Sequence, residues 1–276
     1  MIVDILKKII NFLGIRKYIL KLLTIYGRIF PDRVVSRGGI KYSIDLTEAI
    51  DFNIFLGGWE PKTLKFLRDN LRSGDVVIEV GANVGAHTLV MSRIVEKSGH
   101  VYAFEPTDFA MLKLKRNVEL NKEFSGNITL LQNIVTNGEL NVPRQRIRSS
   151  WKLDSESPAV YAEEECRFSE PVSIDRFVDE YKIGKLNLIK IDTDGYDLKV
   201  LQGAQKALSV FSPVVFIELC QYTLMEQGDS VQEIFYLLAN IGYTGYFEDG
   251  QKIISIEEVL NVVKMDTSIN AIFKFS

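Results

Sequence analysis

The stretch that decides the fold runs from Asp75 to Pro106 and reads DVVIEVGANVGAHTLVMSRIVEKSGHVYAFEP. It begins with an apolar run at 75–80, which is long enough for one buried strand. A glycine turn at 81–85 interrupts this run, and apolar residues then recur at helical spacing through 86–95. A second apolar run at 101–104 follows a short polar turn. Strand, glycine turn, helix and strand make one βαβ unit, which predicts a right-handed crossover in a parallel sheet.

Predicted strands and helices alternate through most of the remaining chain. After a hairpin at 33–46, we expect helices at 61–71, 108–121, 172–181, 196–208 and 231–241, and strands at 128–131, 186–191, 213–218, 243–247 and 270–275. This alternation is typical of an α/β three-layer sandwich, in which a mostly parallel sheet carries helices on both faces. Residues 137–170 are rich in charge and lack periodicity, which predicts a hairpin or a mobile insertion that can cover a ligand site.

The composition is that of an ordinary globular protein of 276 residues, 46% of them hydrophobic and 25% charged. The net charge of -3 gives no sign of a nucleic-acid partner. Cys166 and Cys220 are too few for a disulfide framework and lack metal-ligand spacing, which fits a reducing cytoplasm. With only His87 and His100, the chain has little material for a histidine metal site or a Ser-His-Asp triad.

The first 30 residues differ from the rest in charge. They hold six basic residues against the single acid Asp4, and their apolar residues recur at helical spacing. No apolar run reaches the roughly 20 residues that a spanning helix needs. We therefore divide the chain into a basic amphipathic helical appendage at 1–40 and one catalytic domain at 41–276. The appendage either packs on the domain or on a second subunit, or lies peripherally on the inner membrane surface.

Acidic residues end three of the predicted strands: Glu105, Asp192 and Glu218. Ligands of open α/β sheets bind at the carboxyl ends of the strands, so these positions predict a ligand site. A dinucleotide site usually needs G-x-G-x-x-G, but Asn83 stands where the middle glycine would be, and Glu79 would repel a phosphate. S-adenosylmethionine (SAM) carries an adenosine, an ammonium and a sulfonium but no phosphate. It fits these residues better than NAD does.

The segments DVVIEVGANVGAHT, VYAFEP, SIDRFVDEYKIGKLNLIKIDTDGYDLKVLQGA and PVVFIE resemble the FkbM family of SAM-dependent methyltransferases. The resemblance covers about residues 40–220. It implies the class I methyltransferase sheet of seven strands, the last of them antiparallel, and typically an O-methylation. The family more often has Asp at position 79 and Glu at position 194, and both differences keep the charge. By resemblance, the cofactor-binding residues are Glu79, Gly81, Asn83 and Gly85 around the methionine portion, Glu105 at the ribose hydroxyls, and Gln132 or Asn133 near adenine.

The expected chemistry is the transfer of a methyl group to a substrate oxygen. A saccharide hydroxyl is a poor nucleophile, so we expect a general base beside it. The candidates are Asp192 and Asp194, with Lys190 and Glu218 shaping the charge around them. A magnesium site built from Asp192, Asp194 and Glu218 is a less favoured alternative, because hard cations take carboxylate oxygens. Lys190 lies within an apolar strand, and a structural ion pair is an equally good interpretation of it.

Three other features have both a functional and a structural interpretation. His87 can act as a base or contact the SAM carboxylate, although a local structural role at the helix start is favoured. Trp59 and Glu60 either close over the cofactor or only pack at a helix start. The insertion holds four residues that either grip an acidic or phosphorylated substrate or form a solvated face: Arg144, Arg146, Arg148 and Trp151.

The sequence therefore predicts a cytoplasmic SAM-dependent O-methyltransferase that acts on a hydroxyl of a saccharide, a glycolipid or another secondary metabolite. One rival is an NAD-dependent oxidoreductase or epimerase. A second rival is a non-catalytic, membrane-associated interaction protein on a decayed methyltransferase fold. The sequence leaves the oligomeric state open.

Overall fold

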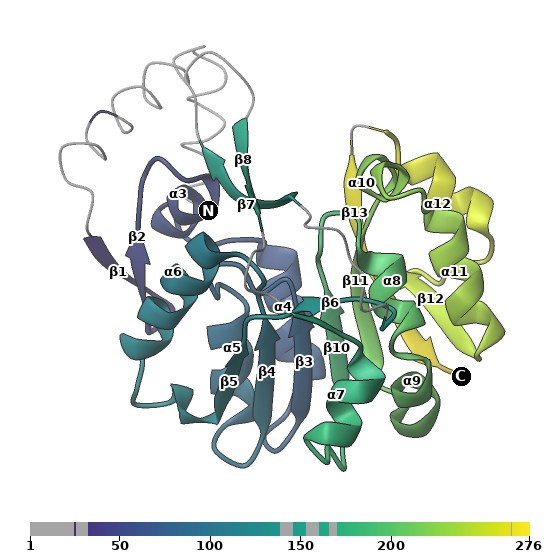
Figure 1. Cartoon of the computed structure of the whole chain (residues 1–276), viewed down its shortest axis with the longest axis horizontal. Helices are drawn as coiled ribbons and strands as arrows, with labels where there is room; N and C mark the ends of the chain where they lie inside the picture. The colour runs from purple at the N-terminus through teal and green to yellow at the C-terminus, as the bar shows by residue number, and fades with distance from the viewer. Residues whose placement is uncertain (1–24, 26–32, 139–145, 153–159, 166–169, 266) are drawn as a thin grey trace.

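The computed structural model describes residue 25 and residues 33–138, 146–152, 160–165, 170–265 and 267–276. Its centre is a seven-stranded sheet with the order β12-β13-β11-β10-β3-β4-β5 (Figure 1). The strands are β3 (Val76–Val80), β4 (His100–Phe104), β5 (Ile128–Leu131), β10 (Leu188–Ile191), β11 (Val214–Cys220), β12 (Tyr243–Phe247) and β13 (Ser268–Phe275). Neighbours from β5 to β11 are parallel, and β13 runs antiparallel to both β11 and β12. This is the class I methyltransferase topology, so the fold class predicted from the sequence is confirmed.

Helices cover both faces of the sheet, as side-chain alternation requires. Ile189 and Ile191 of β10 pack into one core, and Leu188 packs into the other. The first core lies beneath α7 (Ile174–Glu180), α8 (Asp197–Gln202), α9 (Gln205–Phe211), α11 (Val231–Asn240) and α12 (Ile256–Val262). The opposite face is covered by α4 (Pro61–Asn70), α5 (Thr88–Val95) and α6 (Asp108–Glu119). The three layers of the predicted sandwich are therefore present.

A hairpin of β1 (Arg33–Arg37) and β2 (Ile40–Ile44) leads into α3 (Ala49–Phe55). Two buried asparagines, one in α6 and one just after it, bind the backbone of β2. Asn117 Oδ1 accepts from the Ser43 amide at 2.7 Å, and Asn121 Oδ1 accepts from the Lys41 amide at 2.9 Å. The hairpin runs across residue 40, where the sequence analysis places the end of the appendage. Residues 1–24 and 26–32 lie outside the described residues, so the helical appendage stays a prediction.

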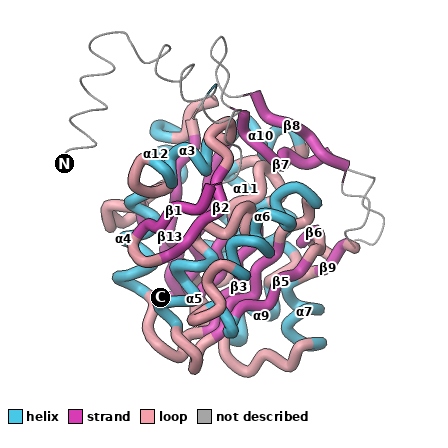
Figure 2. Tube along the Cα trace, turned by 90° about the vertical axis from the view of Figure 1, so that its left-hand side faces the viewer, coloured by secondary structure: helices cyan, strands magenta, loops and turns pink. Residues whose placement is uncertain are grey.

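A second hairpin lies within the segment 137–170. Strands β7 (Arg146–Lys152) and β8 (Val160–Glu165) pair antiparallel, whereas the short strands β6 (Ile134–Val135) and β9 (Pro171–Val172) pair parallel at its base. Figures 1 and 2 show β7 and β8 projecting at the top of the molecule, away from the central sheet. Residues 139–145, 153–159 and 166–169 of the insertion, which include Arg144, lie outside the described part of the chain.

Three details differ from the sequence-based expectation. The helix predicted over 196–208 is two helices, because Gly203 ends α8 and packs so tightly that an added Cβ would lie 2.1 Å from the Thr136 carbonyl oxygen. Helices α3, α10 (Gln221–Glu226) and α12 are short and were not expected. Strand β11 extends to Cys220, so Glu218 lies inside the strand and pairs with Asn270 of β13.

Candidate active site

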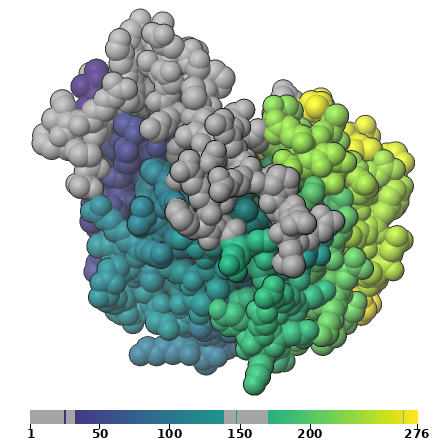
Figure 3. Space-filling model, viewed as in Figure 1, coloured from purple at the N-terminus to yellow at the C-terminus, as the bar shows by residue number. Residues whose placement is uncertain are grey.

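A cavity of about 630 Å³ opens at the carboxyl ends of β3, β4, β10 and β11, where the strand order reverses. Its lining comes from both halves of the chain. In the space-filling view of Figure 3 these halves, purple to teal and green to yellow, occupy opposite sides of the molecule. Ile147 of β7 also lines the cavity, so the second hairpin contributes to its wall.

The glycine turn after β3 is locked to the neighbouring strands. The amides of Gly81 and Ala82 donate to the Phe104 carbonyl of β4 at 3.0 and 2.9 Å. Gly81 has a φ of +87°, and a Cβ added there would lie 1.8 Å from the backbone oxygen of Asp192. Only glycine fits this contact, which brings the turn against the segment that follows β10.

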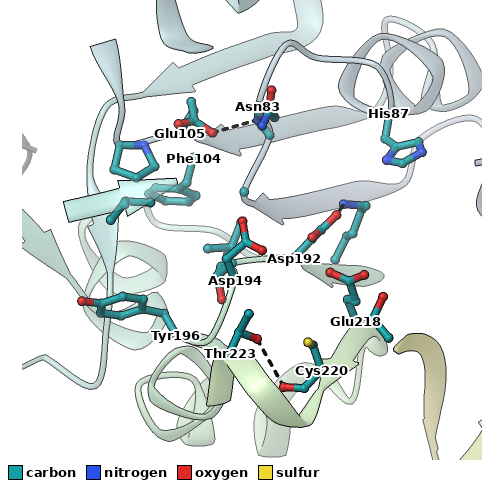
Figure 4. Close-up of a pocket in the computed structure, with 18 of the residues that line it drawn as sticks. Asn83, His87, Phe104, Glu105, Asp192, Asp194, Tyr196, Glu218, Cys220 and Thr223 are labelled. Atoms are coloured by element: carbon teal, nitrogen blue, oxygen red, sulfur yellow. Dashed lines mark hydrogen bonds and ion pairs between the residues drawn. The ribbon is translucent and has the colours of Figure 1, made fainter. Parts of the chain in front are cut away.

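Glu105 follows β4 and has its carboxylate fixed by neighbouring donors. One oxygen accepts from the Asn83 amide at 2.8 Å, and the other accepts from the amide and the hydroxyl of Thr107 at 3.0 and 2.5 Å (Figure 4). Glu105 is only 5% exposed, yet it lines the cavity. Its position is therefore set before any ligand arrives, as ligand recognition by a rigid hydrogen-bond acceptor requires.

Lys190 and Glu79 form a buried ion pair on adjacent strands. The parallel register of β3 and β10 sets Glu79 beside Lys190, both side chains are 1% exposed, and Lys190 Nζ lies 3.7 Å from Glu79 and 3.1 Å from Asp192. Burial alone would lower the pKa of Lys190, but the surrounding carboxylates of Asp192, Glu79 and Glu60 raise it. Burial raises the pKa of Glu79 to about 7, although Lys190 and the Thr88 hydroxyl, at 2.5 Å, oppose this shift. Lys190 is therefore charged at neutral pH.

Asp192 and Glu218 are two carboxyl groups that share a hydrogen bond. Burial and the neighbouring Asp192 raise the pKa of Glu218 well above its ordinary value. Burial would raise the pKa of Asp192 too, but Lys190 outweighs it and lowers that pKa. Within this pair, Glu218 therefore holds a proton more strongly than Asp192, which ionises first. Such a pair can take up a proton from a substrate at the Asp192 carboxylate.

The loop that follows Asp192 is anchored by Asp197 of α8. Its carboxylate accepts from the amides of Thr193 and Gly195 at 3.3 and 3.1 Å. An added Cβ on Gly195 would lie 2.4 Å from the carbonyl oxygen of Thr223, so the loop packs directly on α10. This packing holds Asp194, which has a φ of +51°, in the cavity wall. The sequence analysis did not single out Asp197.

His87, Glu60 and Trp59 line the side of the cavity next to α4. His87 is 4% exposed, and its Nε2 lies 3.7 Å from Glu60 without a hydrogen-bond partner among the described residues. Burial, assisted by Lys190, lowers the pKa of His87 to about 3. The imidazole is therefore neutral at pH 7 and is too weak a base to lead the chemistry, but it can form one hydrogen bond with a ligand.

The structure brings together most of the residues predicted for the site. Lining the cavity are Gly81, Asn83, Glu105, Asn133, Lys190, Asp192, Asp194 and Glu218. Three others do not line it. Glu79 lies beneath α5 because strand alternation points it to that face, Gly85 packs against Leu114, and Gln132 donates to Asp108 at 2.5 Å.

Sequence patterns did not indicate the lining residues that lie directly after β11, just before β13 or at the first position of β13. They are Tyr222, Thr223, Met265, Thr267 and Ser268. The rule that ligands bind at the carboxyl ends of parallel strands could have indicated the first two. The other three reach this edge only because β13 runs antiparallel, and their position follows from the topology rather than from a local motif.

Metal binding and membrane insertion can be assessed only for the described residues. Within these residues no three His, Cys, Asp or Glu side chains are grouped so that they could hold a metal ion, and this includes Asp192, Asp194 and Glu218. The described helices are all too short or too polar to cross a membrane.

The family model for the methyltransferase FkbM domain matches residues 79–244, which is more than half of the chain and includes the lining residues Gly81, Glu105, Lys190, Asp192 and Glu218. The chain belongs to the FkbM methyltransferase family. Because the chain belongs to this family, it is a methyltransferase, and the hypothesis of an NAD-dependent oxidoreductase is not supported. The match also confirms the resemblance to this family that the sequence shows in the glycine turn at 81–85 and in the segment 190–204.

Individual proteins that resemble this chain share less than a quarter of their aligned residues with it. The hexuronic acid methyltransferase AglP of Haloferax volcanii is 24% identical over 160 residues, which are 56% of this chain and 61% of AglP. The matched part thus spans about three-fifths of that relative. The FkbM methyltransferase structure from Methylobacillus flagellatus KT is 14% identical, with a TM-score of 0.46, and the match covers 77% of this chain and 50% of that one. The M. jannaschii TYW2 structure in complex with AdoMet is 13% identical, with a TM-score of 0.42 and coverage of 89% and 87%.

Proposed function

We propose that this methyltransferase uses SAM to methylate a hydroxyl of a saccharide, a glycolipid or another secondary metabolite. The observation that carries the proposal is the cavity, where a fixed acceptor, Glu105, faces the same space as a proton-sharing pair, Asp192 and Glu218. The relative AglP is a hexuronic acid methyltransferase, which supports a saccharide as the acceptor class.

The lining residues fit SAM in shape and charge. Gly81 lines the cavity without a side chain, and the carboxylate of Glu105 suits the two hydroxyls of a ribose. Asn133 lines the same cavity and is the candidate to contact the adenine. Among the described lining residues, acidic side chains outnumber the one lysine, Lys190, which suits a ligand that carries an ammonium and a sulfonium. When bound, SAM supplies a methyl group made electrophilic by its sulfonium.

The chain's own residues would then align the acceptor and remove its proton. Alignment of a nucleophile in line with the methyl group can contribute up to about 7–11 kcal/mol. Asp192 is the ionised carboxylate of the pair and is 31% exposed, so it is the better placed proton acceptor. Lys190 holds its carboxylate at 3.1 Å, and proton acceptance of this kind contributes about 10²–10⁴-fold to the rate. Asp194 remains the second candidate.

Calorimetric titration with SAM, S-adenosylhomocysteine and NAD tests the cofactor. We expect heat with the first two ligands and none with NAD, and the absence of heat with SAM would refute the proposal. Asp192→Asn and Asp194→Asn test the base. We expect one or both to lower kcat by about 10²–10⁴-fold with the SAM dissociation constant nearly unchanged. Full activity in both variants would remove both residues as candidates.

The location of the protein is a separate part of the proposal. Its support is the basic amphipathic pattern of residues 1–30, which favours a cytoplasmic enzyme that rests on an anionic inner membrane surface. Flotation with anionic liposomes, with and without residues 1–30, tests this. Equal flotation of the two forms would contradict it.

A further inference from the structure

A second pocket of about 410 Å³ lies beside the active-site cavity, between the first hairpin and the helices α3, α4 and α5. Its volume is within the range of about 300–1,000 Å³ that ligand sites occupy. The two cavities share the lining residues Trp59 and Ala86. A ligand in the second pocket would therefore lie against the wall of the active site without occupying it.

The floor of the second pocket is apolar. Ile40 and Tyr42 of β2, Ile54 of α3 and Val90 of α5 line it, belong to one hydrophobic core and are at most 7% exposed. The Tyr42 hydroxyl donates to the Ala86 carbonyl at 3.3 Å, so the polar end of this side chain is already hydrogen-bonded. Such a floor favours the burial of an aliphatic chain.

Three arginines from three different elements line the same pocket. They are Arg37 at the end of β1, Arg68 of α4 and Arg93 of α5, and they are the charged residues of its described lining. Arg68 and Arg93 are exposed, and Arg37 is half-buried. A guanidinium group matches the geometry of phosphate, because its planar N–H groups can bind two phosphate oxygens at once.

Two of these guanidinium groups are oriented by hydrogen bonds to neutral acceptors. Arg37 Nε donates to the Ile54 carbonyl at 3.0 Å, and its other two nitrogens donate to neighbouring carbonyls. Arg93 donates to the Gly38 carbonyl in the turn of the hairpin. Of the five N–H donors of a guanidinium, the bonds to described residues use three in Arg37 and one in Arg93. Both groups therefore have a fixed position and further donors for a ligand.

The charge of Arg68 acts on the floor of the pocket. Burial raises the pKa of the Tyr42 hydroxyl, and the positive charge of Arg68 opposes this rise. Interactions between charges weaken with distance and with exposure to solvent, so the guanidinium of Arg68 lies near the apolar floor as well as near the solvent. A ligand that joins a negative group to an apolar chain fits both parts of this pocket.

We propose that the second pocket binds a phosphate ester that carries an apolar chain, which is the chemistry of a lipid phosphate. The phosphate would lie among Arg37, Arg68 and Arg93, and the chain would lie along the floor formed by Ile40 and Val90. Inorganic phosphate matches only the arginines, and an uncharged chain matches only the floor.

Calorimetry on the full chain without SAM tests the binding, so its result does not depend on the proposed methyl transfer. The titrants are octyl phosphate, inorganic phosphate and octan-1-ol. We expect octyl phosphate to bind about 10–100-fold more tightly than inorganic phosphate, because its chain is buried, and about 10–100-fold more tightly than octan-1-ol, because its phosphate accepts charged hydrogen bonds. No binding of octyl phosphate, or equal affinity for it and for either of the other two titrants, would overturn the proposal.

Variants of the arginines test whether the binding occurs in this pocket. Arg68→Gln and Arg93→Gln each remove one charge from an exposed position of the lining, and we expect each to weaken the binding of octyl phosphate about 10-fold. Arg176→Gln is the matched control and should leave the affinity unchanged, because Arg176 is an exposed residue of α7 that pairs with Glu180. Unchanged affinity in both pocket variants, or equal losses in all three variants, would overturn the assignment to this pocket.

Discussion

The two sides of the cavity use acidic residues in different ways. On the side of β3 and β4, Glu105 accepts three hydrogen bonds from neutral donors of Asn83 and Thr107. On the side of β10 and β11, the Asp192 carboxylate lies 3.1 Å from Lys190 Nζ and beside Glu218, whose pKa is raised by burial and by Asp192. The first carboxylate is held in place by neutral donors, and the second lies in a group of ionisable residues whose pKa values depend on one another. This difference is the ground for our proposal that one side positions a ligand and the other side accepts a proton.

The largest expected effect comes from removing the cation of the β10 side. Lys190→Met leaves the buried carboxyl group of Glu79 and the partly exposed carboxylate of Asp192 without their cation, which should cost about 3–5 kcal/mol in the free energy of unfolding. Lys206→Met is a matched control, since its pair with Asp179 is more than half exposed and should contribute less than about 1 kcal/mol. Urea unfolding measures both. Similar losses in the two variants would contradict the buried-pair assignment.

The next effect concerns the contact that joins the two sides. Gly81→Ala places a Cβ 1.8 Å from the Asp192 carbonyl at a φ of +87°, so we expect a loss of about 3 kcal/mol in stability and of SAM binding. Gly184→Ala is the control, because an added Cβ there meets nothing within 4 Å. If Gly81→Ala is as stable as Gly184→Ala in thermal unfolding, the close approach of the turn to β10 is wrong.

A pH effect of somewhat smaller size should come from Glu79. Burial raises its pKa from 4.5 to about 7, so its contribution to stability is complete below about pH 4.5 and is lost as the pH rises through 7. A shift of this size corresponds to at most about 3 kcal/mol between pH 5 and pH 8. Glu79→Gln cannot titrate and should flatten this part of the curve. Parallel curves for both proteins, from denaturant unfolding at each pH, would show that Glu79 does not titrate in this range.

The smallest effect is expected at the acceptor of the β4 side. Glu105→Gln removes a charged acceptor from the ribose position and from the Asn83 amide, which should weaken SAM binding by about 10–100-fold. Calorimetry on Glu105→Gln and on Glu96→Gln, an acid remote from the cavity, gives the comparison. Unchanged affinity for SAM in Glu105→Gln would exclude Glu105 as a ribose ligand.

The sequence predicts the framework of the site better than its chemistry. Apolar runs and the glycine turn are local patterns, so β3, α5 and β4 could be located from 75–106 alone. Ligands of open α/β sheets bind at the carboxyl ends of the strands, and this rule predicted that Glu105 and Asp192 lie at the same edge of the sheet. Features that depend on contacts between distant parts of the chain could not be predicted from local patterns. Strand register and the antiparallel β13 determine three of them: the face to which Glu79 points, the extension of β11 beyond Glu218, and the position of Ser268 at the cavity.

The most direct test of the proposed roles of the two sides measures the SAM dissociation constant and the single-turnover rate in both Glu105→Gln and Asp192→Asn. We expect Glu105→Gln to raise the SAM dissociation constant about 10–100-fold, with a nearly normal rate at saturating SAM. We expect Asp192→Asn to lower the single-turnover rate about 10²–10⁴-fold, with nearly normal affinity for SAM. Equal effects of both variants on the same parameter would contradict it.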